Sequence, residues 1–219
     1  MHGEIRAPRV IRIMPDIAIV DYGMGNLHSV ANAISAVGGV SAIVSNPREL
    51  NEYEKIILPG VGAFSDAMLR LENTGLAEAL TGNVRAGKSI LGICLGMQLM
   101  CLSSEEGGEI TSGLGWFDAH VKKIPALNVK IPHIGWNSLR FNRSGQILDG
   151  LQDNLDVYFV HSYRVECNDD ADVLAWCDYG EPFAAMISRG KLCGMQFHPE
   201  KSQRAGLTMM KNFVESSRC

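Results

Sequence analysis

The chain has 219 residues, of which 46% are hydrophobic, and a formal net charge of −4 at pH 7. This length suits one α/β domain that buries most of its apolar surface, and the negative charge argues against broad binding to nucleic acids or anionic membranes. The longest uncharged stretch, Ser89–Ser104, falls short of the roughly 20 apolar residues that a membrane helix needs. We therefore expect a soluble protein that acts on a small polar substrate, with no nucleic acid or membrane partner.

The cysteines form no metal-binding pattern. The six stand at positions 94, 101, 167, 177, 193 and 219, without a C-x-x-C motif or the Cys/His spacing of zinc sites. Because no secretory signal is recognisable, we expect reduced thiols and a cytoplasmic location. We expect the chemistry to need neither a metal nor a cofactor.

The first part of the chain alternates between strands and helices. Residues 1–13 include three arginines and are expected to form a disordered N-terminal extension, which leaves 14–219 as a single domain. A buried strand over Ile17–Asp21, a helix over 27–37 and a strand over Val40–Val44 then predict a βαβ unit. Such a unit implies parallel strand pairing.

Two further strands continue this pattern. The strand Lys55–Leu58 runs into the loop Pro59–Gly62, two helices follow within 63–85, and the strand Ser89–Ile93 leads into Cys94. Open parallel sheets bind ligands at the carboxyl ends of their strands. The loop Pro59–Gly62 and Cys94 are therefore both expected at the binding edge of the sheet.

After Gly107 the pattern changes to short alternating runs that predict mixed or antiparallel strands covering one side of the core. A final helix is expected over Gln203–Ser216. The fold class is therefore α/β, with a central, mostly parallel sheet, flanking helices and additional mixed or antiparallel strands. The six expected late strands are Phe117–Lys122, Trp136–Phe141, Val157–Val160, Val173–Cys177, Phe183–Ser188 and Lys191–Phe197.

The stretch SILGICLGMQLMC at 89–101 changes from strand-like to helix-like spacing at Cys94, with Leu95, Leu99 and Leu102 on one helical face. Gly92 and Gly96 flank the cysteine, which gives G-x-C-x-G, the thiol form of a nucleophile elbow. In such an elbow the neighbouring backbone leaves no room for Cβ atoms beside an exposed nucleophile. A helix N-terminus favours the thiolate, and the Leu95 amide is placed to hold an oxyanion. The motif alone is also compatible with a small buried cysteine.

The run GMQFHPE at 194–200 supplies the partners that a thiol nucleophile needs. It ends a strand with His198, and Glu200 follows two residues later. A base and an acceptor that orients the base complete the usual arrangement, so Cys94, His198 and Glu200 are expected to form a triad. His161 also ends a strand and is a rival base, but it has no carboxylate nearby in the sequence.

These motifs resemble the class I, triad-type glutamine amidotransferases, and the resemblance extends from Met14 to the C-terminus. Within that family, five dispersed motifs are similar to those of the glutaminase subunits of imidazole glycerol phosphate synthases. They are DYGMGN at 21–26, LPGVGAF at 58–64, PHIGWN at 132–137, YFVHSY at 158–163 and HPEKS at 198–202.

The resemblance implies hydrolysis of glutamine to glutamate and ammonia. The ammonia would pass to a cyclase subunit, a (β/α)8 barrel that forms a heterodimer with this chain. That partner makes imidazole glycerol phosphate and aminoimidazole carboxamide ribotide in histidine biosynthesis.

The resemblance also assigns roles to individual residues. Catalysis falls to Cys94, His198 and Glu200, and the oxyanion to amides among Gly60, Val61, Gly62 and Leu95. The glutamine pocket is expected to include Gln98, Glu106 and Tyr158. The interface and ammonia exit are expected at Met24, Gly25, Asn26, Trp136, Asn137 and Lys201.

Three alternatives remain open from the sequence. A paralogous glutaminase would supply ammonia to a different synthase, for example one that forms amidino groups on sugars. A cysteine hydrolase or peptidase would use the same elbow without releasing ammonia from glutamine. A catalytically silent regulatory module is disfavoured because Cys94, His198 and Glu200 are all present.

Overall fold

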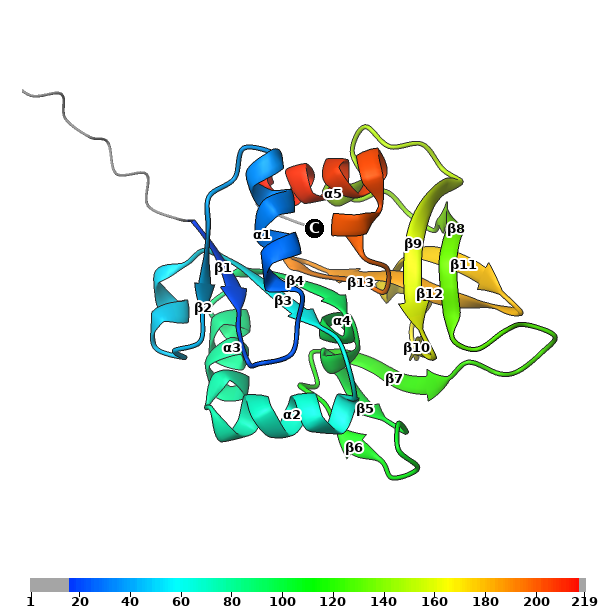
Figure 1. Cartoon of the computed structure of the whole chain (residues 1–219), viewed down its shortest axis with the longest axis horizontal. Coiled ribbons are helices and arrows are strands. Elements are labelled where there is room, and N and C mark those ends of the chain that lie inside the picture. Colours follow the sequence, from blue (N-terminus) through cyan, green and yellow to red (C-terminus); the bar gives the residue numbers. More distant parts are fainter. Residues whose placement is uncertain (1–15, 217–219) are drawn as a thin grey trace, which may run out of the picture.

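Five parallel strands form the centre of the fold, in the order β2-β1-β3-β4-β13. The computed structural model describes residues 16–216, so the extension expected at 1–13 lies outside the described residues. The predicted parallel βαβ start is confirmed, and Figure 1 shows helices on both sides of this sheet. The five strands are β1 (Ile17–Val20), β2 (Ser41–Val44), β3 (Lys55–Gly60), β4 (Ser89–Cys94) and β13 (Leu192–Met195).

Alternating side chains of the buried strands supply two hydrophobic clusters, one on each face of the sheet. In β1, Ile17 and Ile19 belong to the cluster that includes residues of the first and last helices, whereas Ala18 and Val20 belong to the other. Both faces are therefore covered, which explains why β1 is apolar throughout. The helices are α1 (Leu27–Ala36), α2 (Phe64–Asn73), α3 (Leu76–Arg85), α4 (Leu95–Leu99) and α5 (Gln203–Glu215), and the 3-10 turns are η1 (Glu49–Glu52), η2 (Gln146–Leu148), η3 (Asp170–Asp172) and η4 (Pro199–Lys201).

The later strands extend the same sheet instead of forming a separate cover. From β13 the order continues through β12, β10, β7, β5 and β6, while β11 links β12 to the β8–β9 pair. The mixed and antiparallel character expected after Gly107 is confirmed. These strands are β5 (Cys101–Ser104), β6 (Thr111–Ser112), β7 (Phe117–Lys123), β8 (His133–Phe141), β9 (Leu155–His161), β10 (Tyr163–Cys167), β11 (Val173–Tyr179) and β12 (Glu181–Arg189).

The helix after Cys94 is shorter than the leucine spacing predicted. It ends at Leu99, and a strand begins at Cys101, so the expected helical position of Leu102 is wrong. The cause is tertiary, because the Met100 carbonyl accepts from the amides of Trp116 and Phe117. Pairing with a later segment therefore overrides the local helical pattern.

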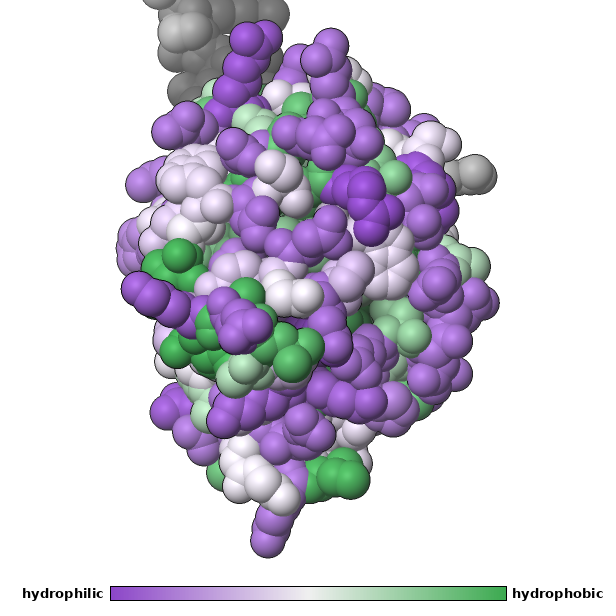
Figure 2. All heavy atoms as spheres, turned by 90° about the vertical axis from the view of Figure 1, so that its right-hand side faces the viewer, coloured by the Kyte–Doolittle hydropathy of each residue, from purple (hydrophilic) through white to green (hydrophobic). Residues whose placement is uncertain are grey.

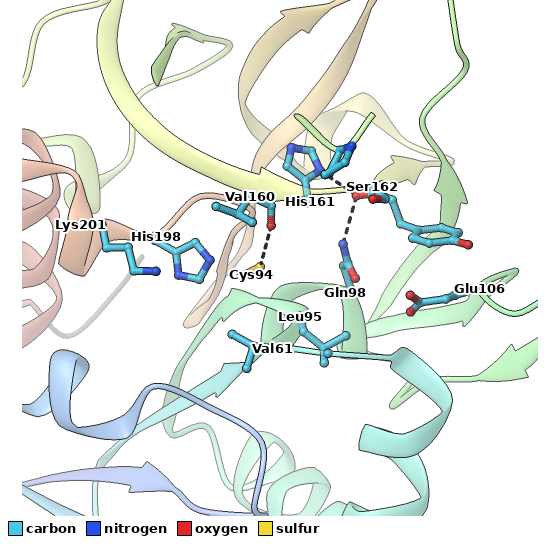
Figure 3. Close-up of a pocket in the computed structure, with 13 residues that line it drawn as sticks. Val61, Cys94, Leu95, Gln98, Glu106, Val160, His161, Ser162, His198 and Lys201 are labelled. Atoms are coloured by element: carbon cyan, nitrogen blue, oxygen red, sulfur yellow. Dashed lines mark hydrogen bonds between the residues drawn. The ribbon is translucent and has the colours of Figure 1, made fainter. Parts of the chain in front are cut away.

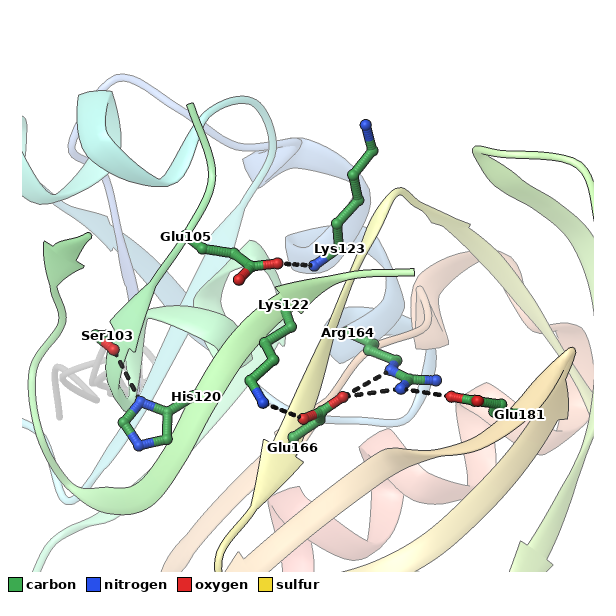
Figure 4. Close-up of polar contacts among 8 residues, drawn as sticks. All are labelled: Ser103, Glu105, His120, Lys122, Lys123, Arg164, Glu166 and Glu181. Atoms are coloured by element: carbon green, nitrogen blue, oxygen red, sulfur yellow. Dashed lines mark hydrogen bonds and ion pairs between the residues drawn. The ribbon is translucent and has the colours of Figure 1, made fainter. Parts of the chain in front are cut away.

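A polar cluster ties the outer strands together on one face (Figure 4). Arg164 on β10 contacts Glu166 at 2.8 Å and Glu181 at 2.9 Å, and Lys122 on β7 contacts Glu166 at 2.7 Å. Such partly exposed ion pairs each contribute at most about 1 kcal/mol, so they fix strand register more than they stabilise the fold. In the described part of the chain, none of the helices has both the length and the apolar composition needed to span a membrane.

Candidate active site

A cavity of about 380 Å³ lies where β3, β4 and β13 end (Figure 3). Gly60 of β3 pairs with Cys94 of β4, and Met195 of β13 pairs with Ile93, so the ends of the three strands converge. The two halves of the sequence therefore meet at one place, as expected for a parallel sheet. The cavity is lined by Val61, Gly62, Cys94, Leu95, Gln98, Glu106, Pro132, Val160, His161, Ser162, Tyr163, His198 and Lys201.

Cys94 stands on a strained turn between β4 and α4. Its φ of 54° and ψ of −111° are rarely adopted by a residue with a side chain. A Cβ on Gly92 would lie 2.7 Å from the Gly96 carbonyl oxygen, and a Cβ on Gly96 would lie 1.7 Å from the Leu58 carbonyl oxygen. The predicted elbow and its need for two glycines are therefore confirmed.

The thiol is less exposed than the elbow motif predicted, because Cys94 is only 7% exposed. Its Sγ lies 3.9 Å from the Val160 carbonyl oxygen and 3.8 Å from Nε2 of Gln196. Since α4 has only five residues, its dipole alone is a weak source of thiolate stabilisation.

His198 and Glu200 are held together by the turn η4 that follows β13. Nδ1 of His198 lies 2.8 Å from Oε1 of Glu200, and both side chains are almost completely buried. Burial lowers the pKa of His198, but its interactions with Cys94 and Glu200 outweigh burial and raise the pKa to about 9. The raised pKa favours the protonated imidazole, and the ring faces Cys94 (Figure 3).

His161 lines the cavity but has no ring nitrogen available to act as a base. Its Nδ1 lies 2.8 Å from the Tyr163 carbonyl oxygen, and its Nε2 lies 2.9 Å from Nδ1 of His133. Burial chiefly lowers its pKa to about 3, although the Tyr163 carbonyl opposes this effect. The geometry thus favours His198 over His161 as the proton carrier.

The expected oxyanion residues surround Cys94 on the side of β3. Val61, Gly62 and Leu95 line the cavity, whereas Gly60 is buried beside them. Gly62 has a φ of +102°, which a residue with a side chain rarely adopts, and Val61 is 43% exposed. The loop is therefore placed at the nucleophile and has a conformation that depends on glycine.

Of the three expected substrate residues, Gln98 and Glu106 reach the cavity and Tyr158 does not. Gln98 is buried, and Glu106 accepts a 2.7 Å hydrogen bond from the Phe64 amide at the start of α2. Tyr158 instead packs its ring against Trp136, with the ring centroids 5.8 Å apart. Tyr163, which was not among the expected substrate residues, lines the cavity.

Gln196 is a site residue that the sequence motifs did not single out. It is 0% exposed and contacts both the Cys94 sulfur and Gln98. The sequence feature that could have identified Gln196 is a lone amide in the apolar run GMQF just before His198. A buried amide needs hydrogen-bonding partners.

The residues expected at an interface differ in exposure, and of the six only Lys201 lines the cavity. Trp136 is 48% exposed on β8, Lys201 is exposed at the cavity rim, and Asn26 is exposed at the start of α1. Met24 and Gly25 are half-buried, and Asn137 is half-buried on β8.

Hydrophobic side chains continue this surface along β8 and β9. Ile134 pairs with Val160 and Trp136 pairs with Tyr158, and Ile134, Trp136 and Val160 are all exposed. Figure 2 views the side of the molecule where these strands lie and shows hydrophobic side chains gathered in a patch on a largely hydrophilic face. An exposed apolar patch of this kind is typical of a protein interface.

Within residues 16–216, no three His, Cys, Asp or Glu side chains come together in a way that could hold a metal ion. The five cysteines of that range are free thiols.

Comparison with known proteins identifies relatives over almost the whole described chain. Residues 18–216 match the family described as "Glutamine amidotransferase class-I". The chain is 46% identical over 202 residues to imidazole glycerol phosphate synthase subunit HisH of Moorella thermoacetica, covering 92% of this chain and 95% of the relative. It is 49% identical over 196 residues to the protein of the same name from Aquifex aeolicus, covering 89% and 94%.

Solved structures share the same fold at lower identity. A glutamine amidotransferase crystal structure aligns with a TM-score of 0.72 at 18% identity, covering 91% of this chain and 97% of that one. The structure of PurLQS from Thermotoga maritima aligns with a TM-score of 0.74, also at 18% identity and over the same shares. These two likenesses establish the fold.

Proposed function

The chain belongs to the class I glutamine amidotransferases, and from this premise we propose that it is the glutaminase subunit of an imidazole glycerol phosphate synthase. The observation that carries the proposal is the strained Cys94 beside the buried His198–Glu200 pair. The names of the relatives from Moorella and Aquifex support the choice of synthase.

The reaction begins at the Cys94 sulfur. We propose that the proton of the Cys94 thiol passes to His198, whose pKa is raised to about 9. The thiolate attacks the side-chain carbonyl carbon of glutamine and forms a C–S bond. His198 then donates its proton to the amide nitrogen, the C–N bond breaks, and ammonia leaves.

Water completes the cycle. Neutral His198 accepts a proton from a water molecule, whose oxygen attacks the γ-glutamyl thioester, and glutamate leaves as the Cys94 thiolate and the His198 imidazolium are restored. Glu200 orients the ring through Nδ1 and balances its charge. The Leu95 amide and an amide of the loop 60–62 are proposed to hold the oxyanion of both tetrahedral intermediates, where one donor is worth on the order of 3 kcal/mol.

The substrate pocket is proposed to recognise the amino-acid end of glutamine. The carboxylate of Glu106 suits the α-ammonium group, and Gln98 offers an amide beside it. The other end of the substrate then reaches Cys94. This arrangement leaves no assigned role for Tyr158 in binding glutamine.

We further propose that the loop 60–62 gates the reaction. Ammonia lost to water would defeat transfer to a synthase, so the oxyanion amide is expected to be aimed at the substrate only when the partner is bound. The exposure of Val61 and the glycine-dependent conformation at Gly62 support a loop that can change its backbone orientation.

The proposed partner is a cyclase subunit with a (β/α)8 barrel, bound as a heterodimer. The exposed patch of Ile134, Trp136 and Val160 supports a docking face beside the cavity mouth. Met24, Gly25, Asn26, Asn137 and Lys201 are assigned to the rim of this face and the ammonia exit.

Two further assignments belong to this proposal. The domain is proposed to span 14–219, with 1–13 as an extension, and the family match over 18–216 supports its extent. The protein is proposed to act in the cytoplasm, and the free thiols of the described cysteines support a reducing compartment.

The deciding experiment is glutamate release from glutamine by the purified chain, alone and with a cyclase subunit and its ribotide ligand. Cys94→Ala serves as the blank. Strong activation by partner and ligand is the expected result. Fast release by the chain alone would contradict gating, and activity that never rises with this cyclase would point to a different synthase. The absence of any ammonia release that depends on Cys94 would contradict the proposed function.

A further inference from the structure

A line of hydrogen-bonded polar groups runs from the Cys94 sulfur to the β8 edge, and the reaction steps leave most of it without a role. Its side chains between Cys94 and Asn137 are all buried. Buried polar groups are retained when they are satisfied, and a fully satisfied network fixes one arrangement. The groups, in order from the sulfur, are Gln196, Gln98, the Tyr163 carbonyl, His161, His133 and Asn137.

The amide orientations in the first half follow from the acceptors. The Tyr163 carbonyl can only accept, so the Gln98 atom at 3.1 Å from it is Nε2. The same Nε2 lies 2.9 Å from Gln196, which must therefore present Oε1 to it. The NH2 group of Gln196 then faces the Cys94 sulfur, at 3.8 Å.

The tautomers in the second half follow in the same way. Nδ1 of His161 must donate to the Tyr163 carbonyl, and because burial lowers the pKa of His161 to about 3, its Nε2 carries no proton. That bare nitrogen accepts from Nδ1 of His133 at 2.9 Å. Burial also lowers the pKa of His133 to about 4, so its Nε2 accepts from Asn137 at 3.4 Å.

Both ends of the line are fixed. Nδ2 of Asn137 also donates to the Asp178 carbonyl at 3.0 Å. The His133 ring is stacked between Tyr179 and Phe159, with centroid distances of 3.8 Å and 4.7 Å. These contacts hold the ring in the plane that its two hydrogen bonds require.

We propose that this hydrogen-bonded line holds the Cys94 sulfur in its reactive position, with Gln196 and His133 as positioning residues. The Gln196 amide can donate a hydrogen bond to the Cys94 thiolate. The Val160 carbonyl, which also contacts the sulfur, can accept a hydrogen bond only from the neutral thiol. The Gln196 amide therefore favours the charged nucleophile over the neutral one. His133 acts through His161 and the Tyr163 carbonyl, which anchor Gln98 and hence the orientation of Gln196. This inference deepens the proposed function and rests on it for the meaning of a reactive Cys94.

The test measures alkylation of Cys94 by iodoacetamide against pH on the full chain, read on the Cys94 peptide by mass spectrometry. Gln196→Met keeps the length of the side chain and removes both hydrogen bonds. We expect the midpoint of its alkylation profile to rise by about one pH unit. Gln196→Glu keeps the acceptor for Gln98 and puts a carboxylate beside the sulfur, so a shift at least as large is expected.

Variants at the far end separate positioning from packing. His133→Phe keeps the stacked ring without its nitrogens and is expected to slow alkylation about threefold. His133→Asn restores a donor near Nδ1 and should recover part of that loss. The matched control is His120→Phe, which should leave alkylation unchanged. His120 is half-buried on β7, outside the cavity lining, and its Nδ1 lies 2.9 Å from the hydroxyl of Ser103 (Figure 4).

Wild-type alkylation profiles in both Gln196 variants, each with a cooperative thermal unfolding transition, would overturn the role of Gln196. A wild-type profile in His133→Phe would overturn the role of His133. Alkylation requires neither glutamine nor a partner, so these outcomes stay separate from the glutaminase assay that tests the proposed function.

Discussion

His198 and Glu200 form a charged pair inside a single short turn, with 2.8 Å between Nδ1 and Oε1. The two residues lie in sequence around Pro199, so the pair needs only the local conformation of η4. The fold contributes the third member, Cys94, from a strand more than a hundred residues earlier. The proposed active site therefore combines a proton carrier that is built locally with a nucleophile that the sheet positions.

Glu200→Gln is expected to reduce the proposed glutaminase activity strongly while keeping the shape of the side chain beside His198. Loss of the carboxylate charge lowers the pKa of His198 below its value of about 9. We expect kcat/KM to fall by roughly 10²–10⁴-fold, and the pH profile together with NMR of the imidazole checks both effects. Glu215→Gln, in an exposed pair with Lys211, is the control, and an unchanged pH profile in Glu200→Gln would contradict this assignment.

Stability should depend on the charge of His198. Its folded-state pKa of about 9 lies above the ordinary value of 6.5, so folding favours the protonated ring. The stabilisation is complete below about pH 6.5 and is lost as the pH rises through about 9. In denaturant titrations, the free energy of unfolding of the wild type should exceed that of His198→Gln by more at about pH 6 than at about pH 9.5. A difference in the free energy of unfolding that grows as the pH rises would contradict the prediction.

Gly96→Ala should destabilise the fold far more than an alanine placed elsewhere in a helix. The new Cβ would lie 1.7 Å from the Leu58 carbonyl oxygen, which is backbone and cannot move aside cheaply. We expect a loss of more than about 3 kcal/mol in the free energy of unfolding, measured by denaturant titration. Gly82→Ala in α3 meets nothing within 4 Å and should instead gain about 0.5–1 kcal/mol from helix propensity.

Glu106→Gln is predicted to weaken glutamine binding without uncapping α2. The amide oxygen can still accept from the Phe64 amide, but the charge that suits an α-ammonium group is gone. We expect KM for glutamine to rise by about 10–100-fold with a smaller change in kcat, measured by steady-state kinetics of the activated complex. Glu109→Gln, exposed in the same loop, should keep the wild-type KM, and equal KM values in both variants would count against the proposed contact.

Trp136→Ala tests the docking face. The ring is 48% exposed, so its removal should change the thermal unfolding midpoint of the free chain only slightly. A large aromatic at the centre of an interface is often worth about 2 kcal/mol or more, so the Kd for the cyclase should rise at least about tenfold by calorimetry. Ile110→Ala, at a site that is 81% exposed, is the control for a surface substitution. Equal affinity in the two variants would place the interface elsewhere.

The parts of the site that depend on local sequence were predictable. The elbow at Cys94 requires small neighbours within two residues, and the His198–Glu200 pair is two residues apart, so both are visible in one short window. The parallel sheet followed from the alternation of strands and helices. Its register then placed the loop 60–62 beside Cys94, as the rule for strand ends predicts.

The parts that depend on long-range contacts were not predictable. The helix after Cys94 ends early because Trp116 and Phe117 bond to the Met100 carbonyl, which no local pattern reveals. Tyr158 is not part of the cavity lining and packs against Trp136, its cross-strand partner. The contact of Gln196 with Cys94 spans 102 residues and joins the ends of β13 and β4, which only the folded sheet brings together.

The Gln98 amide is bound in one direction only. Both hydrogens of its Nε2 point inward, to the Tyr163 carbonyl and to Gln196, which leaves the oxygen for the pocket. Glu106 offers a second acceptor at the same end (Figure 3). We therefore expect this end of the cavity to prefer ligands that bring hydrogen-bond donors. A ligand with a keto group or a second carboxylate in the position of the amine would leave the acceptor oxygens of Gln98 and Glu106 without a donor.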